Sequence, residues 1–353
     1  MKTGFAQEQN RAKLYQQISD NYVYDITFDK LSVAALKNLN KIDKNLQVGN
    51  DNFRVSLYYK GKLIQVLNKP KTESDVVAWG QLTENMVNEA IRVSPTAAEK
   101  DFLVDDVLAE GMVSVLDEAS KYYRSSDEVG GGGRNRRVFA VRDEEKFFYV
   151  KIKAFNKQTV TDLKKEFEKY DGKKGIVFDL RGCSGGMAGA AIEAADLFLD
   201  TGIICSIKDK NAAEQTYFVA EKGDMAKGSR IFILTDEKTA SAAEIFAAAL
   251  QEQSRAEIIG TLTTGKGSMQ KLISVPNGGV LAVTNSFVFT PSGRQLDTVG
   301  IIPDICTFER NESANINALI EQKKVSCDRE DRENKEIELE IVAALLNIKS
   351  KNN

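Results

Sequence analysis

The chain has 353 residues and a net charge of −3, with no basic excess that would indicate nucleic acid as a partner. Hydrophobic residues make up 42% and charged residues 28% of the sequence, which is typical of a globular protein with room for two domains. No histidine is present, so catalysis by Ser-His or Cys-His pairs is excluded, as are metal sites that need imidazole. The sequence contains no run of 18 or more apolar residues, so no membrane span is predicted.

The N-terminal region is predicted to be mainly helical. Its first residues, MKTGFAQEQN, lack the apolar core of a signal peptide, which indicates either a protein that is not exported or a sequence without its leader. Helical spacing of apolar residues predicts helices within residues 5–45, with Asp29 capping the second one. Two short strands, FRVSLYY and GKLIQVL, flank the Lys60–Gly61 turn, and residues 73–93 and 97–123 read as helices.

Four consecutive glycines, Gly130–Gly133, follow this region. A run of glycines cannot sustain a helix or a strand, so it favours a flexible linker. A phosphate-binding loop is the alternative, but no strand–glycine–helix order with an intact motif supports it.

After Arg137 the pattern changes to alternating strands and helices, which predicts an α/β core with a largely parallel sheet. The expected strands are FFYVKIKAF, GIVFDLRG, RIFILTD and AEIIGTL, and the helices between them are VTDLKKEFEKYD, MAGAAIEAADLFLD and SAAEIFAAALQEQ. After Gly265 the sequence becomes β-rich in QKLISVP and GVLAVTNSFVFT. It ends in an amphipathic helix near EIELEIVAALLNIK.

Two turns that follow strands have the residues for acyl-transfer chemistry. In DLRGCSGG, Gly185 and Gly186 can direct backbone N–H groups into a cavity at a helix N-terminus, as an oxyanion hole requires. A plain tight connection is the alternative. In TASAAE, Ser241 begins a helix, where it is either a cap or a nucleophile at the positive end of the helix dipole. The N–H of Ala242 would then be a second oxyanion donor.

A third segment, GKGSMQ, supplies a candidate base. Between two glycines, Lys266 adds no stability to a helix or strand, so its side chain is expected to matter. A desolvated lysine has a lowered pKa, which lets it accept a proton from serine. Gln270 can orient the amine, whereas a solvated loop lysine is the plain alternative. The spacing of Gly260, Gly265 and Lys266 resembles a nucleotide-binding P-loop. However, Gly267 stands where that motif has Ser or Thr, and a strand follows where it needs a helix.

The cysteines Cys183, Cys205, Cys306 and Cys327 are widely spaced and match neither a zinc site nor a CxxC redox motif. They are therefore expected to be isolated reduced or buried thiols.

The ordered set DLRGCSGG, TASAAE, GKGSMQ and FTPSGRQLDTVGIIPD resembles the carboxy-terminal processing (tail-specific) protease family, from about Phe148 to Asp304. The resemblance implies an α/β fold: a crotonase/ClpP-like protease core, a mainly helical N-terminal domain and a C-terminal helix. It implies a serine endopeptidase that cleaves proteins near their C-termini without a metal or cofactor. It assigns Ser241 as nucleophile, Lys266 as base, Gln270 as its orienting residue, and the backbone of Gly185, Gly186 and Ala242 as the oxyanion hole.

The sequence departs from the family pattern at two points. Cys183 stands where the family usually has Asn, and as an alternative nucleophile it lacks an evident base. The PDZ domain that family members usually insert before the core is missing, and the glycine run resembles a deletion scar. The expected division is a helical domain at 1–128, a linker at 129–137, a protease core at 138–310 and a helical extension at 311–353.

These departures leave other functions open. A catalytically impaired member that serves as a scaffold or regulator is one, and acyl-thioester chemistry on a crotonase-like core is another. The partners implied are protein or peptide substrates, and the apolar surplus of the N-terminal helices is compatible with a homo-oligomer. By resemblance the location is the periplasm or cell envelope, with the cytoplasm left open.

Overall fold

The computed structural model describes residues 2–128, 139–172, 174–275, 277–297, 299–308, 315–321, 327–331 and 336–350. The chain divides into two compact units, unit 1 (residues 1–134 and 269–286) and unit 2 (residues 135–268 and 287–353). The segment 269–286, expected in the core, therefore clusters with the N-terminal region. The glycine linker expected at 129–137 lies outside the described residues.

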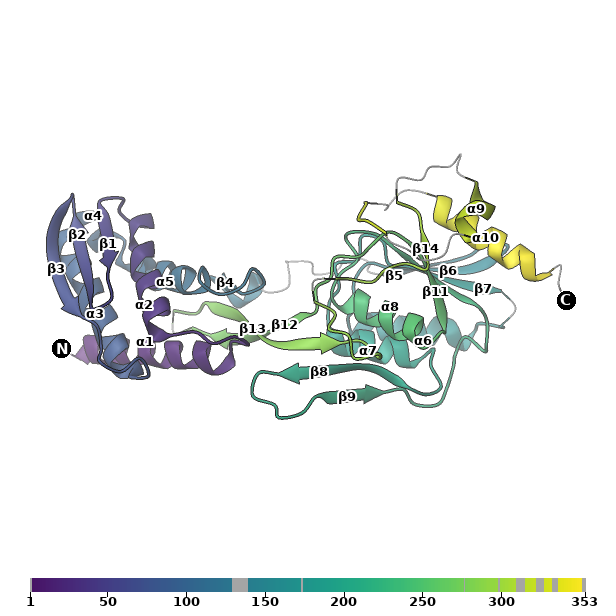
Figure 1. The fold of residues 1–353 in the computed structure, drawn as a ribbon, viewed down its shortest axis with the longest axis horizontal. Helices are drawn as coiled ribbons and strands as arrows, with labels where there is room; N and C mark the ends of the chain where they lie inside the picture. The colour runs from purple at the N-terminus through teal and green to yellow at the C-terminus, as the bar shows by residue number, and fades with distance from the viewer. Residues whose placement is uncertain are drawn as a thin grey trace. The chain divides into compact units, whose positions relative to one another are not determined.

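Unit 1 combines helices with a small sheet (Figure 1). Its helices are α1 (Lys2–Asn21), α2 (Phe28–Lys37), η1 (Asn38–Lys41), α3 (Val76–Val93), α4 (Pro95–Glu99), η2 (Asp101–Leu103), α5 (Val104–Val113) and η3 (Ser126–Glu128). Its sheet is antiparallel, in the order β1 (Leu46–Asn50), β2 (Arg54–Tyr59), β3 (Lys62–Asn68). The two predicted strands are β2 and β3, joined at Lys60 and Gly61, where positive φ angles close the turn.

Two local expectations for unit 1 are wrong. Thr27, and not Asp29, caps α2, because its hydroxyl accepts from Lys30 N at 3.3 Å while Asp29 lies inside the helix. The end of the predicted helix 97–123 is instead strand β4 (Lys121–Tyr123), which pairs antiparallel with β13 (Val280–Phe289). β12 (Ser268–Ser274) neighbours β13, and their buried apolar residues join the core around Trp79.

Unit 2 is built on a six-stranded sheet in the order β14–β11–β10–β7–β6–β5. The strands are β5 (Phe139–Asp143), β6 (Phe147–Ile152), β7 (Gly175–Asp179), β10 (Ile231–Thr235), β11 (Ala256–Gly260) and β14 (Ile305–Cys306). All neighbours are parallel except β5 and β6. The predicted α/β core with a largely parallel sheet is confirmed. The antiparallel pair of β8 (Ile203–Asp209) and β9 (Thr216–Val219), which lies outside this six-stranded sheet, was not predicted.

Helices cover both faces of this sheet (Figure 1). The helices are α6 (Lys157–Glu168), α7 (Ala188–Asp196), α8 (Ala242–Glu252), α9 (Ile316–Glu321) and α10 (Ile337–Ser350). On the α6–α8 side, Phe178 packs edge-on against Phe246 of α8, with ring centroids 5.2 Å apart. On the other side, Val177 shares a buried cluster with Ile341 of α10. Because side chains alternate along a strand, Asp179 lies on the same face as Val177, the face that α10 covers.

Candidate active site

Ser241 lies at the turn between β10 and α8, and its backbone is strained. Its φ is +56° and its ψ is −118°, a region that residues other than glycine rarely occupy and that costs of order 1–3 kcal/mol. The Ser241 N–H donates to Glu244 Oε2 at 2.7 Å, and Ala240 N donates to Cys183 O at 3.0 Å. The side chain is partly exposed at the first turn of α8. Such strain is typical of functional residues that their surroundings hold in place.

The glycine turn after β7 lies directly against Ser241. Gly185 has φ +107°, and a Cβ there would come within 2.7 Å of Ala240 O and 2.9 Å of Ser241 Cβ. Gly186 has φ +137°, and a Cβ there would collide with the backbone of Phe155. Only glycine therefore lets the two turns approach so closely. The structure thus brings Gly185, Gly186, Ser241 and Ala242 into one neighbourhood.

Two backbone donors at this junction are unused. Met187 N donates to Phe155 O at 2.8 Å, and Phe155 N donates to Gly185 O at 2.8 Å. Within the part of the chain that the structure describes, neither Gly186 N nor Ala242 N has a hydrogen-bond acceptor. Ala242 is the first residue of α8, where the helix itself supplies no acceptor. Unpaired N–H groups beside a serine are what the stabilisation of an oxyanion requires.

We expect Gly186→Ala to impair both folding and activity, because its Cβ would strike the Phe155 carbonyl and move the adjacent N–H group. The free energy of unfolding should fall by about 1–3 kcal/mol, and kcat for the peptide cleavage that the resemblance implies should fall by about 10²-fold or more. Urea unfolding and cleavage of an unfolded protein measure the two effects. Gly189→Ala in α7 is the matched control: its Cβ would meet no atom within 4 Å, so it should gain about 0.5–1 kcal/mol. Parent activity in Gly186→Ala would contradict the assignment of this turn.

Lys266 lies in the loop between β11 and β12 and belongs to unit 2. Gly265 has φ +78°, and Gly267 N donates to Asp297 Oδ1 at 3.1 Å, which fixes the backbone on both sides of the lysine. The Lys266 side chain is exposed, so the apolar surroundings expected from the sequence are absent here. Among the described residues its amine makes no hydrogen bond or ion pair, and none joins it to the Ser241 hydroxyl.

Glu244 joins the two loops through its buried carboxylate. Oε2 accepts from Ser241 N at 2.7 Å and from Lys266 N at 2.9 Å. Oε1 accepts from Gly265 N at 2.7 Å and from the Thr263 hydroxyl at 2.5 Å. Burial raises the pKa of this carboxyl, against the lowering effect of its donors. The backbone positions of the candidate nucleophile and base are thereby fixed to a common group.

Sequence reasoning assigned no role to Glu244. The signal was present, because a serine followed three residues later by glutamate at a helix start is the pattern of a capping box. In the structure the Glu244 carboxylate accepts from Ser241 N, as in a capping box. It also accepts from the backbone of the Lys266 loop, a contact that no local motif specifies.

Gln270 belongs to the other compact unit. It lies on β12, and its Nε2 donates to the Thr284 hydroxyl at 3.3 Å on β13. The residues that unit 2 gathers are thus the serine, the glycine turn, Ala242 and the backbone of the lysine, while the proposed orienting glutamine lies in unit 1.

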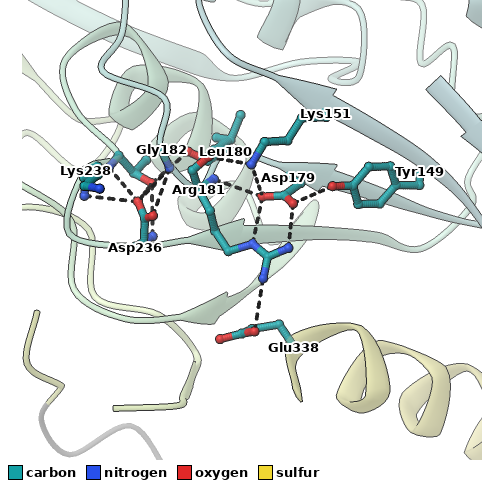
Figure 2. Close-up of polar contacts among 10 residues, drawn as sticks. Tyr149, Lys151, Asp179, Leu180, Arg181, Gly182, Asp236, Lys238 and Glu338 are labelled. Carbon is teal, nitrogen blue, oxygen red and sulfur yellow. Dashed lines mark hydrogen bonds and ion pairs between the residues drawn. The ribbon is translucent and has the colours of Figure 1, made fainter. Parts of the chain in front are cut away.

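A buried ionic cluster supports the base of the glycine turn (Figure 2). Arg181 binds Asp179 through two hydrogen bonds, Nε to Oδ1 at 2.9 Å and Nη2 to Oδ2 at 2.6 Å. Its Nη1 reaches Glu338 Oε2 of α10 at 3.3 Å. Tyr149 and Lys151 also donate to Asp179, at 2.5 and 3.2 Å. Although burial opposes ionisation, the Arg181 guanidinium holds the pKa of Asp179 below its usual value.

Asp236 ties the glycine turn to the serine turn. Its carboxylate accepts from Gly182 N at 2.9 and 3.0 Å and from Thr239 N at 3.0 Å. The Thr239 hydroxyl donates in turn to Leu180 O at 3.0 Å. Burial raises the pKa of Asp236. Figure 2 shows the Asp236 carboxylate beside the Gly182 backbone.

The cysteines are of two kinds. Cys183 and Cys205 are buried free thiols, and burial raises the pKa of Cys183 to about 11. A thiol that remains protonated is a poor nucleophile, which weakens the alternative reading of Cys183. Cys306 and Cys327 instead form a disulfide, so the expectation of isolated thiols is wrong for this pair.

The described residues contain no group of three or more potential His, Cys, Asp or Glu ligands for a metal ion. In the same part of the chain, no helix is long and apolar enough to cross a membrane.

Comparisons with known proteins find similarity over part of the chain. Residues 146–307 match the model of peptidase family S41. A carboxy-terminal-processing protease of Bartonella bacilliformis is 37% identical over 163 residues, which cover 44% of this chain and 38% of that protein. The chloroplastic carboxyl-terminal-processing peptidase 2 of Arabidopsis thaliana is 33% identical over 179 residues, 50% of this chain and 33% of that protein. The chain thus matches less than half the length of these relatives.

Solved structures are more distant. The photosystem II D1 C-terminal processing protease has a TM-score of 0.42 and 20% identity, covering 71% of this chain and 54% of that one. A lipoprotein from Streptococcus agalactiae has a TM-score of 0.48 and 18% identity, covering 64% of this chain and 82% of that one.

Proposed function

We propose that this chain is a member of the carboxy-terminal processing protease family and a serine endopeptidase with a Ser-Lys dyad, because residues 146–307 match the model of peptidase family S41. The observation that carries the proposal is the junction of the two turns. A strained serine at a helix start lies against a glycine turn, and two backbone donors beside it lack acceptors among the described residues. This arrangement suits attack on a carbonyl and stabilisation of the resulting oxyanion.

In the proposed reaction the neutral amine of Lys266 takes the proton of the Ser241 hydroxyl as Oγ bonds to the peptide carbonyl carbon. The N–H groups of Gly186 and Ala242 hold the oxyanion. The C–N bond then breaks, and Lys266 passes its proton to the leaving amine, which leaves an acyl-enzyme on Ser241. Water, deprotonated by the same lysine, releases the new carboxyl terminus and regenerates the serine.

The exposed amine of Lys266 has to move for this reaction. Its backbone is anchored by Glu244, so only the flexible four-carbon side chain must turn toward Ser241. A substrate that covers the site would also exclude water from the ammonium group, and burial disfavours a charged amine. Catalytic hydrogen bonds are often made only in the substrate complex, so an exposed side chain is compatible with the role. Gln270 remains the proposed orienting residue.

Two observations favour a second function. The amine of Lys266 contacts no acidic or polar group of the described residues, and Gln270 lies in the other compact unit. A catalytically impaired member that binds protein chains as a scaffold or regulator would tolerate both. Such a protein would bind unfolded substrates without cleaving them.

The disulfide supports the proposed location. Disulfides persist in oxidising compartments and are rare in reducing cytosol, so the Cys306–Cys327 bond favours the periplasm or cell envelope over the cytoplasm. The proposed partners there are protein or peptide substrates. A homo-oligomer through the N-terminal helices stays a prediction.

Cleavage of one unfolded protein, with a free or an amidated C-terminus, tests the proposed function. Because the relatives are named for processing at the carboxyl terminus, we expect the parent to release fragments from that end, and more slowly when the terminus is amidated. Mass spectrometry locates the cuts, and Ser241→Ala is the control for contaminating peptidases. Cuts spread evenly along both substrates would remove the tail preference but keep the peptidase. Binding without any cleavage would favour the scaffold.

A further inference from the structure

A short segment of the C-terminal extension, Cys327–Asp331, lies along the loop that carries Lys266. Sequence reasoning placed it only within a helical extension, but these residues form neither helix nor strand. Its first residue is bonded to Cys306, the last residue of β14, so the start of the segment is covalently fixed to the edge of the central sheet. We call residues 327–331 the strap.

The strap hydrogen-bonds to the beginning of the loop. Leu262 N donates to Asp328 O at 3.0 Å, and the Thr261 hydroxyl donates to Glu330 O at 2.8 Å. Leu262 lies beyond Gly260, the last residue of β11, so the strap supplies an acceptor that strand pairing would otherwise provide.

Arg329 extends these contacts toward the lysine. Its Nε donates to Thr263 O at 2.9 Å and its Nη2 to Thr264 O at 3.1 Å. The planar guanidinium fixes two successive carbonyls at once, which a single ammonium group cannot do with the same geometry. These carbonyls immediately precede Gly265 and Lys266, and the Thr263 hydroxyl binds Glu244 on the other side.

The strap also reaches the turn that precedes Ser241. Glu237 N donates to Glu330 O at 3.2 Å, and Lys238 forms an ion pair with Asp331. One five-residue segment therefore contacts both loops that carry the candidate dyad.

We propose that the strap holds the Lys266 loop in register with Ser241, with Arg329 as the positioning residue and the Cys306–Cys327 disulfide as its anchor. The inference rests on the proposed function for its catalytic consequence. A loop of three threonines and two glycines loses considerable backbone entropy when it is ordered. The strap fixes it before substrate binds, so the lysine side chain starts from a defined backbone position.

Kinetics of Arg329→Ala and Arg329→Lys test the proposal. Loss of the two hydrogen bonds should lower kcat about tenfold in Arg329→Ala. KM should change less than about twofold, because no strap residue is proposed to touch substrate. Arg329→Lys should recover part of kcat, and the Cys306→Ser/Cys327→Ser pair should lower it in the same direction. Arg92→Ala, at a side chain 68% exposed in unit 1, is the control and should leave kcat unchanged.

Amide hydrogen exchange gives a readout that does not need activity. Leu262, Gly265 and Lys266 donate backbone hydrogen bonds, and their N–H groups should exchange faster in Arg329→Ala and in the double cysteine variant. A parent without peptidase activity would defeat the proposed function, while exchange would still decide the strap. Unchanged exchange at these three amides would overturn the strap, whether or not kcat falls. So would a kcat equal to that of the parent in Arg329→Ala.

Discussion

Ser241→Ala and Lys266→Ala should each reduce kcat on an unfolded protein by about 10³-fold or more, because a nucleophile and its base act as one unit. Lys266→Arg should be equally inactive, since a guanidinium cannot give up its proton near neutral pH. Neither change removes a buried contact, because both side chains are at least partly exposed, so the free energy of unfolding should stay near that of the parent.

The chain offers a matched control for the serine. Ser254, just beyond the end of α8, has the same φ of +56° but is remote from the glycine turn in sequence. Ser254→Ala should leave kcat unchanged, which separates loss of the nucleophile from the effect of altering a strained serine. Rates of fragment release, measured at saturating substrate, compare the variants. Parent-like rates in both Ser241→Ala and Lys266→Ala would show that the dyad is wrongly assigned.

Arg181→Met should destabilise the protein by about 3–5 kcal/mol, because it leaves buried carboxylates without their shared cation. Asp179 would retain Tyr149 and Lys151, while Glu338, which is fully buried, would lose its guanidinium partner and keep the Thr307 hydroxyl at 2.8 Å. Urea unfolding, with the slope compared to that of the parent, measures the loss.

The partner variant controls for the lost charge. Glu338→Leu in the Arg181→Met background removes one of the buried carboxylates that lost the guanidinium, so it should restore part of the lost stability. Arg54→Met, at an exposed ion pair with Asp51, should change the free energy of unfolding by less than about 1 kcal/mol. A loss below 1 kcal/mol in Arg181→Met would mean that the buried cluster does not hold the glycine turn.

The core of unit 2 could be predicted because its strands are buried on both faces. β7 and β10 read as unbroken apolar runs followed by turn residues, a pattern that needs no knowledge of neighbours. β9 could not be predicted, since TYFV is short, mostly exposed, and defined by its pairing with β8. The same reason explains β4, whose residues continued a helical pattern until β13 paired with them.

The individual site residues were predictable only from local turns. Ser241, Gly185 and Gly186 carry signals in their own segments, and the structure places them together. Glu244 and Arg329 were missed because their roles are made by contacts between segments distant in sequence. The Cys306–Cys327 pairing was missed for the same reason, because cysteine spacing alone does not specify connectivity.

The state of Lys266 could not be predicted either. Desolvation depends on what covers the side chain, and the sequence describes only the glycines beside it. The structure shows an anchored backbone and an exposed side chain. The proposed reaction therefore requires the Lys266 side chain to turn toward Ser241.

The position of the acyl group tests the central claim most directly. The protein would be mixed with the p-nitrophenyl ester of a blocked peptide and quenched in acid, and the acylated residue would be located by mass spectrometry. We expect one acyl group per chain on Ser241, which should be absent from Ser241→Ala and strongly reduced in Lys266→Ala. An acyl group on Cys183, or on Ser241 to the same extent without Lys266, would contradict it.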